Sequence, residues 1–349
     1  MPLQDMELAD KRITTLLQDE FPLCEDPYGE IGRRAELGLS AEEVRARVHH
    51  LKKGRVIRQI SAIFDSRNLG YKSSLVAMKA PADRVDECAK VVSRHPGVSH
   101  NYKRDHEFNI WFTIAVPPGQ SLQEHVEALH AKAGAIVTRP LPTLKLYKIG
   151  VKLNLEDPSV EAATAKEAEG SVWNHLLPEP VRLTEKEIAA VRVLQRDIDT
   201  AILHPYEPMA KELGISQQEL FEIVRDFQKR ALLRRVAAIL HHRKAGFRSN
   251  GMGVWAVPED KVDEYGQKMA QFKIVSHCYR RPVYPDWRYN LFTMVHAEND
   301  DGCRAIIKQM SQETGLTDYT VLFSTVEYKK TRVEYFAEDD YSWLFDKAA

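Results

Sequence analysis

Residues 98–113 read VSHNYKRDHEFNIWFT, and residues 275–293 read VSHCYRRPVYPDWRYNLFT. Both stretches begin with Val-Ser-His, continue into a tyrosine followed by two cations, and end on an apolar run that closes with Phe-Thr. His277 follows His100 by 177 positions. This long shared pattern indicates that the chain contains a duplication, which is the first feature to look for in a sequence.

The duplication extends over most of the chain. Phe292 follows Phe112 by 180 positions, so we align these two residues and expect three extra residues in the second copy of the motif. The Tyr-Lys pair at 147–148 recurs at 328–329, which is an offset of 181. The repeating unit is therefore about half the protein. This excludes a solenoid, because solenoid repeats span only ~20–50 residues.

Length and composition describe a globular protein of several domains. The chain has 349 residues, of which 44% are hydrophobic and 28% are charged. At ~100–200 residues per domain, this length predicts about two to four domains, each with an apolar core. The formal net charge of −1 argues against a protein that mainly coats nucleic acid, because such binding depends on neutralising phosphates.

The sequence shows no targeting or metal-cluster motif. The N-terminal residues lack the apolar core of a signal peptide, and no run of ~18 apolar residues predicts a membrane helix. We therefore expect a cytoplasmic protein without membrane contact. The cysteines lie far apart and form no Cys-x-x-Cys pair, which disfavours a zinc site or a disulfide framework. They are Cys24, Cys88, Cys278 and Cys303.

Each half begins with the pattern of a helix-turn-helix. In the first half, Gly38 marks a tight turn and Ser40 caps a helix over 41–53, with Glu43 in the capping-box position. In the second half, Ser216 caps the corresponding helix. The residues after each of these third helices alternate as in a strand, which predicts a winged helix-turn-helix.

A second pattern follows each wing, in the order strand, helix, strand, strand, helix, strand. This βαββαβ order is typical of a ferredoxin-like domain, in which two helices cover one face of an antiparallel sheet. The last strand of the first half is expected over 143–155. The open face of each sheet must be covered, and the other half is the natural partner. We therefore predict that the two halves form a pseudo-dimer within one chain.

The predicted fold class is α+β, as a tandem duplication. Each half combines a winged helix-turn-helix domain with a ferredoxin-like domain of the AsnC effector type. The charged stretch at 156–170 and the Pro-Glu-Pro at 178–180 mark a linker between the halves. The predicted segments are 1–60 and 61–155 for the two domains of the first half, 156–180 for the linker, 181–236 and 237–336 for the second half, and 337–349 for a C-terminal tail.

The winged helix together with the ferredoxin-like unit resembles the Lrp/AsnC family of transcription regulators. The resemblance lies in G-L-S-x-x-x-V-x-x-R at 38–47 and in I-R-x-x-x-A-x-x-D-x-x-x-L-G-Y at 57–71. It implies that the third helices enter the major groove of DNA and that the sheet binds a small effector. The first recognition helix, however, carries Glu42 and Glu43, and Ile223 replaces Arg47 in the second copy. Carboxylates at these places disfavour phosphate contacts.

The duplicated motifs resemble the siroheme decarboxylase family. Residues 100–113 look like the first subunit type, whereas residues 241–247 and 278–293 look like the second type. The resemblance covers essentially the whole chain in the fused D-L arrangement of heme d1 biosynthesis. It implies conversion of siroheme to 12,18-didecarboxysiroheme by loss of two acetate carboxylates as CO2, in heme d1 or alternative heme biosynthesis. It further implies that no cofactor is required, because the iron belongs to the substrate.

The residue types in the motifs suit such a substrate. Siroheme is flat and rich in carboxylates, so its site needs cations, of which arginine offers a planar bidentate fork, and apolar walls. The candidate carboxylate-binding cations are Arg104, Arg280, Arg281, Arg288 and Lys103, and the candidate walls are Trp111, Phe112, Trp287, Tyr289 and Phe292. We add Asn109 and Asn290 as further substrate-binding candidates.

Loss of CO2 from a ring acetate leaves a carbanion that an acid must protonate. Histidine and a tyrosine beside a cation can deliver that proton. We predict His100 or His106 with Tyr102 in the first half, and His277 with Tyr279 in the second half. Imidazole is also a common axial ligand of haem iron. His241 and His242 are the main candidates for that role, together with His100 and His277.

Two other functions stay open at this point. The first is a DNA-binding regulator of the Lrp/AsnC type that senses a tetrapyrrole, and the second is a tetrapyrrole carrier that leaves its ligand unchanged. For the enzyme we expect siroheme as the binding partner, with a companion pair of subunits or a second copy of the chain as further partners. DNA binding is not expected.

Overall fold

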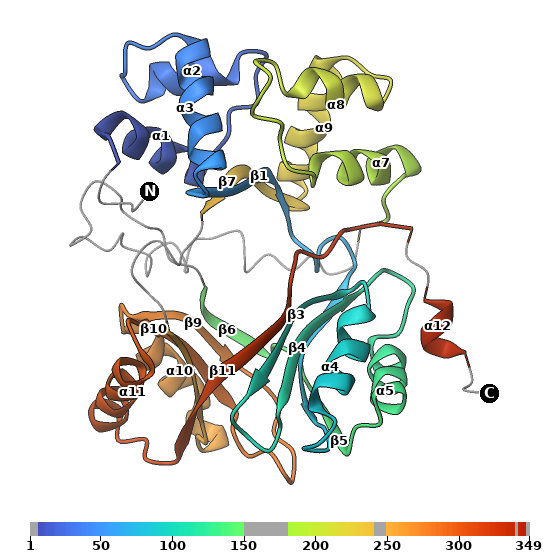
Figure 1. Cartoon of the computed structure of the whole chain (residues 1–349), viewed down its shortest axis with the longest axis vertical. Coiled ribbons are helices and arrows are strands. Elements are labelled where there is room, and N and C mark those ends of the chain that lie inside the picture. The colour runs from blue at the N-terminus through green and yellow to red at the C-terminus, as the bar shows by residue number, and fades with distance from the viewer. Residues whose placement is uncertain (1–5, 150–180, 241–248, 339–340, 347–349) are drawn as a thin grey trace. The chain divides into compact units, whose positions relative to one another are not determined.

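The computed structural model describes residues 6–149, 181–240, 249–338 and 341–346. These residues form two units, shown in Figure 1. The first unit contains the described residues up to Gly70 together with residues 181–240, and the second contains residues 71–149 together with those from 249 onward. Each unit therefore takes residues from both halves of the duplicated chain.

The first unit holds the two helix-turn-helix segments. Each third helix begins with a capping box, in which Ser40 pairs with Glu43 and Ser216 pairs with Glu219, as the sequence predicts. The elements of this unit are α1 (Leu8–Asp19), α2 (Pro27–Arg34), α3 (Ala41–Lys53), β1 (Ile57–Phe64), α7 (Glu185–Leu194), α8 (Tyr206–Glu212), α9 (Gln217–Lys229) and β7 (Leu233–Leu240).

The strands after the third helices pair with each other. β1 and β7 form a two-stranded antiparallel ribbon, in which Ile60 lies opposite Ala238 and Phe64 lies opposite Leu233. The two predicted wings are thus joined across the halves, and Figure 1 shows this ribbon beneath α3 and α9. The first unit is a pseudo-dimer in its own right.

The second unit holds the two ferredoxin-like segments. Its first-half elements are β2 (Lys72–Lys79), α4 (Val85–Arg94), β3 (Val98–Arg104), β4 (Ile110–Val116), α5 (Leu122–Ala133), β5 (Val137–Leu141) and β6 (Lys145–Ile149). Its second-half elements are β8 (Ser249–Trp255), the short η4 (Glu259–Lys261), α10 (Val262–Gln271), β9 (Val275–Arg280), β10 (Leu291–Ala297), α11 (Asp300–Thr314), β11 (Tyr319–Lys330) and α12 (Ser342–Phe345).

The strands of this unit form one sheet in the order β5-β2-β4-β3-β11-β8-β10-β9-β6. The strands at its two ends, β5 and β6, are consecutive in the chain and are separated only by residues 142–144. The sheet therefore curls back on itself as a barrel. In Figure 1, α4 and α5 cover one side of this barrel, and α10 and α11 cover the other side.

The last strand of each half crosses into the opposite half. β11 pairs with β8 as far as Phe323 and then with β3 from Ser324 onward. β5 pairs with β2, and its continuation β6 pairs with β9. The strand expected over 143–155 therefore begins earlier, at Val137, and is interrupted around Pro142, which cannot donate a backbone hydrogen bond to a sheet. Residues 150–155 lie outside the described residues.

The repeated Tyr-Lys pair fastens each crossing strand to the opposite half. The hydroxyl of Tyr147 donates to Asp263 in the first turn of α10, and Nζ of Lys148 donates to the carbonyl of Phe272 at its C-terminal end. Tyr328 likewise donates to Asp86 of α4. Nζ of Lys329, equivalent to Lys148, donates to two carbonyls at the end of α4. A cation at the C-terminal end of a helix also interacts favourably with its dipole.

The strand register corrects the sequence alignment of the motif. Tyr102 lies opposite Trp111, and its equivalent Tyr279 lies opposite Phe292. Trp111 is therefore equivalent to Phe292 at an offset of 181, and the alignment of Phe112 with Phe292 is wrong by one residue. A slip of one residue moves every side chain to the other face of a strand. The second motif loop is longer by four residues, not by three.

Three apolar clusters fill the second unit. One lies between the sheet and α4 and α5, and the second lies between the sheet and α10 and α11. The third is the barrel interior, where the open faces of both halves meet as the sequence predicts. Its buried members are Ala77, Phe108, Trp111, Leu141, Met252, Val254, Trp287, Phe292 and Leu322.

The C-terminal segment packs on the outside of the first half. Leu344 of α12 is buried in the cluster beneath α4 and α5. The ring of Tyr341 lies against His95 and His125, with centroid distances of 5.2 and 4.9 Å. These two histidines are themselves buried, and Nε2 of His95 lies 2.8 Å from Nδ1 of His125.

Candidate functional site

The three motif residues His100, Tyr102 and Arg104 lie on one face of β3. The side chain of Asn101, between them, donates to the carbonyl of Ala89 on α4 at 2.9 Å, so Asn101 faces the outer helices. Alternate residues of a strand point to opposite faces. His100, Tyr102 and Arg104 therefore face the barrel interior, and we call them the first ladder.

The second half repeats this arrangement on β9. Cys278 is buried against α10, where its Sγ lies 3.6 Å from the carbonyl oxygen of Gly266. His277, Tyr279 and Arg281 consequently face the barrel interior, and we call them the second ladder. The second ladder is equivalent to the first, residue by residue, at an offset of 177.

The histidine and tyrosine rings take nearly the same relative positions in both ladders. The centroids of His100 and Tyr102 are 6.2 Å apart with an interplanar angle of 33°. Those of His277 and Tyr279 are 6.0 Å apart with an angle of 25°. Two separate stretches of sequence thus build one geometry, in which an imidazole and a phenol share a face of the strand.

A serine next to each ladder histidine holds its ring. Oγ of Ser99 lies 3.0 Å from Nδ1 of His100, and Oγ of Ser276 lies 2.8 Å from Nδ1 of His277. A hydrogen bond to one ring nitrogen fixes the orientation of the imidazole and the role of the other nitrogen. Sequence reasoning did not assign these serines a function, although the repeated Val-Ser-His carried the signal.

The ladder arginines are buried cations. The exposed fractions of Arg104 and Arg281 are 8% and 9%. Burial lowers the pKa of each guanidinium to about 10, so both stay charged at neutral pH. Within the described residues, Nε of each arginine has no hydrogen-bond partner. A buried charge is costly unless it is paired, so each guanidinium is a candidate for binding an anion.

The backbone fixes where these guanidiniums lie. Nη1 of Arg104 donates to the carbonyl of Leu322 at 2.8 Å, and Nη1 of Arg281 donates to the carbonyl of Leu141. The guanidinium of Arg281 also lies over the ring of Tyr279, 4.9 Å from its centroid. A cation over the face of a phenol is attracted by the ring quadrupole, so this contact links Tyr279 to Arg281.

Two predicted aromatic walls lie deep in the barrel. Trp111 and Trp287 are almost fully buried, with ring centroids 5.2 Å apart. Nε1 of Trp111 donates to the carbonyl of Phe108 at 2.7 Å. Both residues belong to the interior cluster and pack there against each other. Phe112 faces the helices instead, because of the register described above.

Asn109 and Asn290 are equivalent residues whose amides are occupied by the backbone. The side chain of Asn109 accepts from the N–H of Ala80 and donates to its carbonyl, both at 2.9 Å. Asn290 forms the same pair of bonds with Val257. The structure does not bring these residues to the ladders as substrate-binding groups. They fasten the motif loop to the end of the first strand in each half.

Three predicted cations also lie away from the ladders. Arg280 alternates with Arg281 and forms ion pairs with Glu259 and Asp263 on the helix side of the sheet. Arg288 is exposed and forms a bidentate ion pair with Asp318 at 2.8 and 2.9 Å.

Lys103 alternates with Tyr102 and therefore points to the outer face as well. The sequence predicts that these three residues act together with the ladder arginines. In the structure, Arg280 and Lys103 alternate with ladder residues and so point to the opposite face, and Arg288 is exposed.

His106 lies in the first motif loop and not in a ladder. Its ring stacks on Phe108 and contacts the edge of Trp287, and its Nδ1 accepts from the N–H of Phe108 at 3.1 Å. Burial lowers its pKa below the usual value, so it is neutral at pH 7. His241 and His242, the candidate axial ligands, lie outside the described residues.

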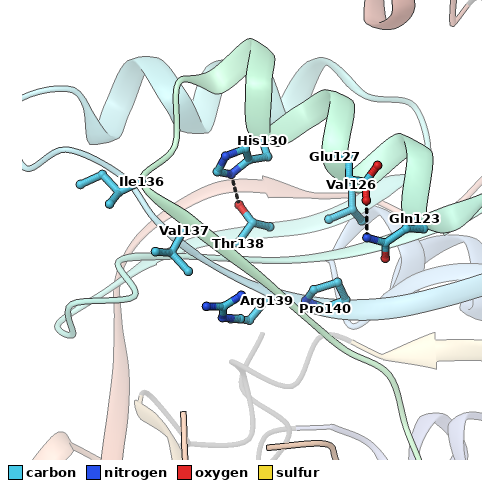
Figure 2. Close-up of a pocket in the computed structure, with 9 residues that line it drawn as sticks. All are labelled: Gln123, Val126, Glu127, His130, Ile136, Val137, Thr138, Arg139 and Pro140. Carbon is cyan, nitrogen blue, oxygen red and sulfur yellow. Dashed lines mark hydrogen bonds between the residues drawn. The ribbon is translucent and has the colours of Figure 1, made fainter. Parts of the chain in front are cut away.

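A surface cavity lies elsewhere, between α5 and β5. Its volume is about 300 Å³, and Figure 2 shows His130, Thr138 and Arg139 among the residues that line it. Nδ1 of His130 lies 3.0 Å from the hydroxyl of Thr138. The cavity contains no ladder residue, and its volume is at the lower limit for a small-ligand pocket of ~300–1,000 Å³. It is therefore a poor match for a flat macrocycle.

The recognition helix α3 is engaged within the first unit. Nη1 of Arg45 donates to the carbonyl of Ala201 at 3.1 Å, and Nζ of Lys52 donates to that of Ile198 at 2.7 Å. Arg47 forms an ion pair with Asp10 at 3.0 Å. These cations are directed at protein groups, which disfavours the contacts to DNA phosphates that a helix-turn-helix regulator requires.

Two other features are absent from the described ranges. No helix there is long and apolar enough to cross a membrane. In the same residues, no group of three or more His, Cys, Asp or Glu side chains is arranged to hold a metal ion.

Comparison with protein families gives two matches. A model of the AsnC-like ligand binding domain matches residues 68–148 and 244–329, which are the two ferredoxin-like segments. A model described as the siroheme decarboxylase NirDL-like HTH domain matches residues 10–58.

Several curated proteins are similar to the chain. A siroheme decarboxylase of Hydrogenobacter thermophilus is 38% identical and covers 95% of this chain and 96% of its own length. Single halves also have relatives. A siroheme decarboxylase beta subunit of Methanosarcina barkeri is 46% identical over 37% of this chain and 85% of the subunit. An alpha subunit of Desulfovibrio desulfuricans is 39% identical over 45% of this chain and 89% of the subunit.

Two solved structures share the whole fold. The crystal structure of the siroheme decarboxylase NirDL has a TM-score of 0.77 and 32% identity, and covers 96% of this chain and 97% of that one. The same enzyme in co-complex with an iron-uroporphyrin III analogue has a TM-score of 0.76 and 32% identity, with 95% of both chains covered.

Proposed function

This chain belongs to the siroheme decarboxylase family, and on that premise we propose that it converts siroheme to 12,18-didecarboxysiroheme. The reaction removes two acetate carboxylates as CO2 and makes the protein a carboxy-lyase of heme d1 or alternative heme biosynthesis. The observation that carries the proposal is the pair of equivalent ladders, His100-Tyr102-Arg104 and His277-Tyr279-Arg281, which place cations and proton donors on the interior face of the barrel.

The arginines supply binding and register. Siroheme is a polyanion, and a guanidinium that is already desolvated and held by a backbone carbonyl loses little freedom when it binds a carboxylate. Nε of Arg104 and of Arg281 has no hydrogen-bond partner within the described residues and can donate in this contact. The side chains are charged despite burial, so each attracts a carboxylate that is not to be removed and thereby orients the ring.

The histidine and tyrosine of each ladder supply the proton. The carbon–carbon bond to the departing carboxylate breaks, CO2 leaves, and the electron pair stays on the methylene carbon, from which the conjugated ring can spread it. A proton from the imidazolium or the phenol then converts the methylene into a methyl group, and water restores the acid. Each decarboxylation therefore consumes one proton and requires neither oxidant nor reductant. Acid–base catalysis of this kind contributes ~10²–10⁴-fold.

The iron enters with the substrate in this proposal, and no further cofactor is needed. A ladder histidine that binds the iron would need a neutral ring nitrogen, and Ser99 and Ser276 hold the opposite nitrogen of each ring. The proposed partner is accordingly the tetrapyrrole itself, and the intramolecular contacts of the α3 cations disfavour DNA as a partner.

Anaerobic incubation of the protein with siroheme, followed by mass spectrometry of the tetrapyrrole, tests the proposal. We expect a product that has lost two CO2 units. A tetrapyrrole that binds but keeps its mass would indicate a carrier instead. Tight binding of promoter DNA over random DNA in a gel-shift experiment, without turnover, would indicate a regulator.

A further inference from the structure

The second motif loop, residues 282–289, reaches across the barrel and is fixed to the first half. Backbone hydrogen bonds of 2.8 and 2.9 Å join Tyr284 and Trp287 into a small hairpin. The hydroxyl of Tyr284 donates to the carbonyl of Pro140 at 2.6 Å, and Asp286 forms a bidentate ion pair with Arg139. These contacts hold Trp287 in the interior.

Trp287 contacts both members of two equivalent pairs of residues. Its ring centroid lies 5.2 Å from that of Trp111 and 6.2 Å from that of Phe292, which are equivalent in the corrected register. It lies 5.6 Å from Phe108 and 5.1 Å from Tyr289, each of which precedes the clamping asparagine of its half. A point nearly equidistant from both members of two related pairs lies close to the axis that relates them. Trp287 therefore occupies the pseudo-twofold axis of the barrel.

A position on such an axis has room for one side chain only. Trp287 is 2% exposed in an interior cluster made of both halves, and protein interiors are as densely packed as organic crystals. A second indole supplied by the equivalent loop would have to occupy the same volume. The first half instead has four residues, 105–108, between the ladder arginine and the asparagine, where the second half has eight.

We propose that the loop 282–289 determines which halves can pair, because a half that carries Trp287 fits only a half without this loop. We call the loop the pairing key. Two halves with the loop would place two indoles on one axis, whereas two halves without it would leave that space unfilled. The partner that this interface selects is thus a ferredoxin-like segment of the first type. The proposal concerns assembly of the barrel and is independent of the proposed activity.

Two substitutions in the full-length chain, one on each side of the axis, test the proposal by exchanging side-chain volume. Phe292→Trp adds side-chain volume on one side of Trp287, and Trp111→Phe removes side-chain volume on the other side. We expect each single variant to melt at a lower temperature than the parent, and the double variant W111F/F292W to recover most of the loss. A double variant that loses as much as the two single variants together would overturn the proposal, because Trp287 would then not lie between the two positions.

Transfer of the key provides a second readout. In one full-length chain, residues 105–108 are replaced by a copy of residues 282–289 while Trp287 is kept. In a second chain, the same graft is combined with Trp287→Ala. The second chain contains one tryptophan fewer, yet we expect it to melt at the higher temperature. Equal or greater stability of the chain with two keys would contradict the proposal, and the volume exchange decides the matter if neither graft folds.

Discussion

Arg104 and Arg281 occupy equivalent places in the two halves, and each donates from Nη1 to a backbone carbonyl of the opposite half. The acceptors, Leu322 and Leu141, lie where the last strand of each half crosses over. The arginine that we assign to substrate binding is therefore positioned by the other half of the chain. Each ladder therefore depends on a backbone contact from the other half.

Replacement of a ladder arginine is expected to impair turnover. Arg281→Met keeps much of the buried volume but removes the cation, so we expect kcat/KM for siroheme to fall by about 10- to 100-fold, as for loss of a charged hydrogen bond. Steady-state kinetics with mass detection of the product measures this effect. Arg104→Met should behave alike.

Arg288→Met is the matched control for the arginine variants. Arg288 belongs to the same motif but is exposed and pairs with Asp318, so its loss should leave kcat/KM near the parent value. Arg280→Met should resemble this control, because Arg280 faces Glu259. Equal losses from Arg281→Met and Arg288→Met would refute the assignment of the ladder.

Loss of a ladder histidine is expected to slow protonation of the product carbon. His100→Phe and His277→Phe should each lower kcat by about 100-fold or more while siroheme still binds. Single-turnover experiments under anaerobic conditions should show the partially decarboxylated tetrapyrrole if the two ladders serve different acetates. Unchanged kcat in both variants would rule out a role for these imidazoles.

The clamping asparagines should matter for stability rather than for chemistry. Asn109→Ala leaves the backbone N–H and carbonyl of Ala80 without their partners, so we expect it to lower the free energy of unfolding by about 1–3 kcal/mol. Asn290→Ala should do the same at Val257. Denaturant titration measures the loss. A large fall in kcat without a change in stability would return these residues to the substrate site.

The buried pair His95 and His125 predicts sensitivity to acid. Burial lowers the pKa of His95 from 6.5 to about 3 and lowers that of His125 as well, so the folded state favours the neutral rings. The stability that this provides is complete above pH ~6.5 and is lost as the pH falls toward the folded pKa, with a slope of up to about 1.4 kcal/mol per pH unit for each ring. Denaturant titrations between pH 7 and 4 measure it.

His125→Gln separates this pair from other acid effects. The amide keeps a polar contact to His95 but does not titrate, so the variant should lose less stability than the parent over the same pH range. The charged groups that face the pair include Lys329, whose Nζ donates to the carbonyl of His95 and which stays charged over the whole range. An identical pH dependence in parent and variant would exclude the pair as its source.

Much of the fold follows from local sequence signals. The capping boxes at Ser40 and Ser216 appear in the structure where the sequence predicts them, and so does the βαββαβ order, except that the last strand of the first half begins earlier than expected. The exchange of strands does not follow from such signals. Whether β11 pairs with its own half or with β3 depends on contacts between residues far apart in the chain, such as that of Tyr328 with Asp86. Such contacts cannot be recognised from the residues that lie next to them in the sequence.

The residue types of the ladders followed from the sequence, but the direction of each side chain did not. The resemblance of the motifs to siroheme decarboxylases implied a flat, anionic ligand, and the ladders contain six of the residues predicted to bind or protonate it. The direction of each side chain depends on strand register, which separates Arg281 from its neighbour Arg280. The alignment of Phe112 with Phe292 was wrong because it also depended on strand register. Both motifs end in Phe-Thr, and matching these ends gives three extra loop residues where the structure has four.

The crystal structure of this protein with siroheme bound tests the central claim most directly. We predict that the ring lies against both ladders, with substrate carboxylates at Nε of Arg104 and Arg281 and with a ring carbon that bears an acetate within reach of His100 or His277. A tetrapyrrole seated away from both Val-Ser-His segments would contradict the account.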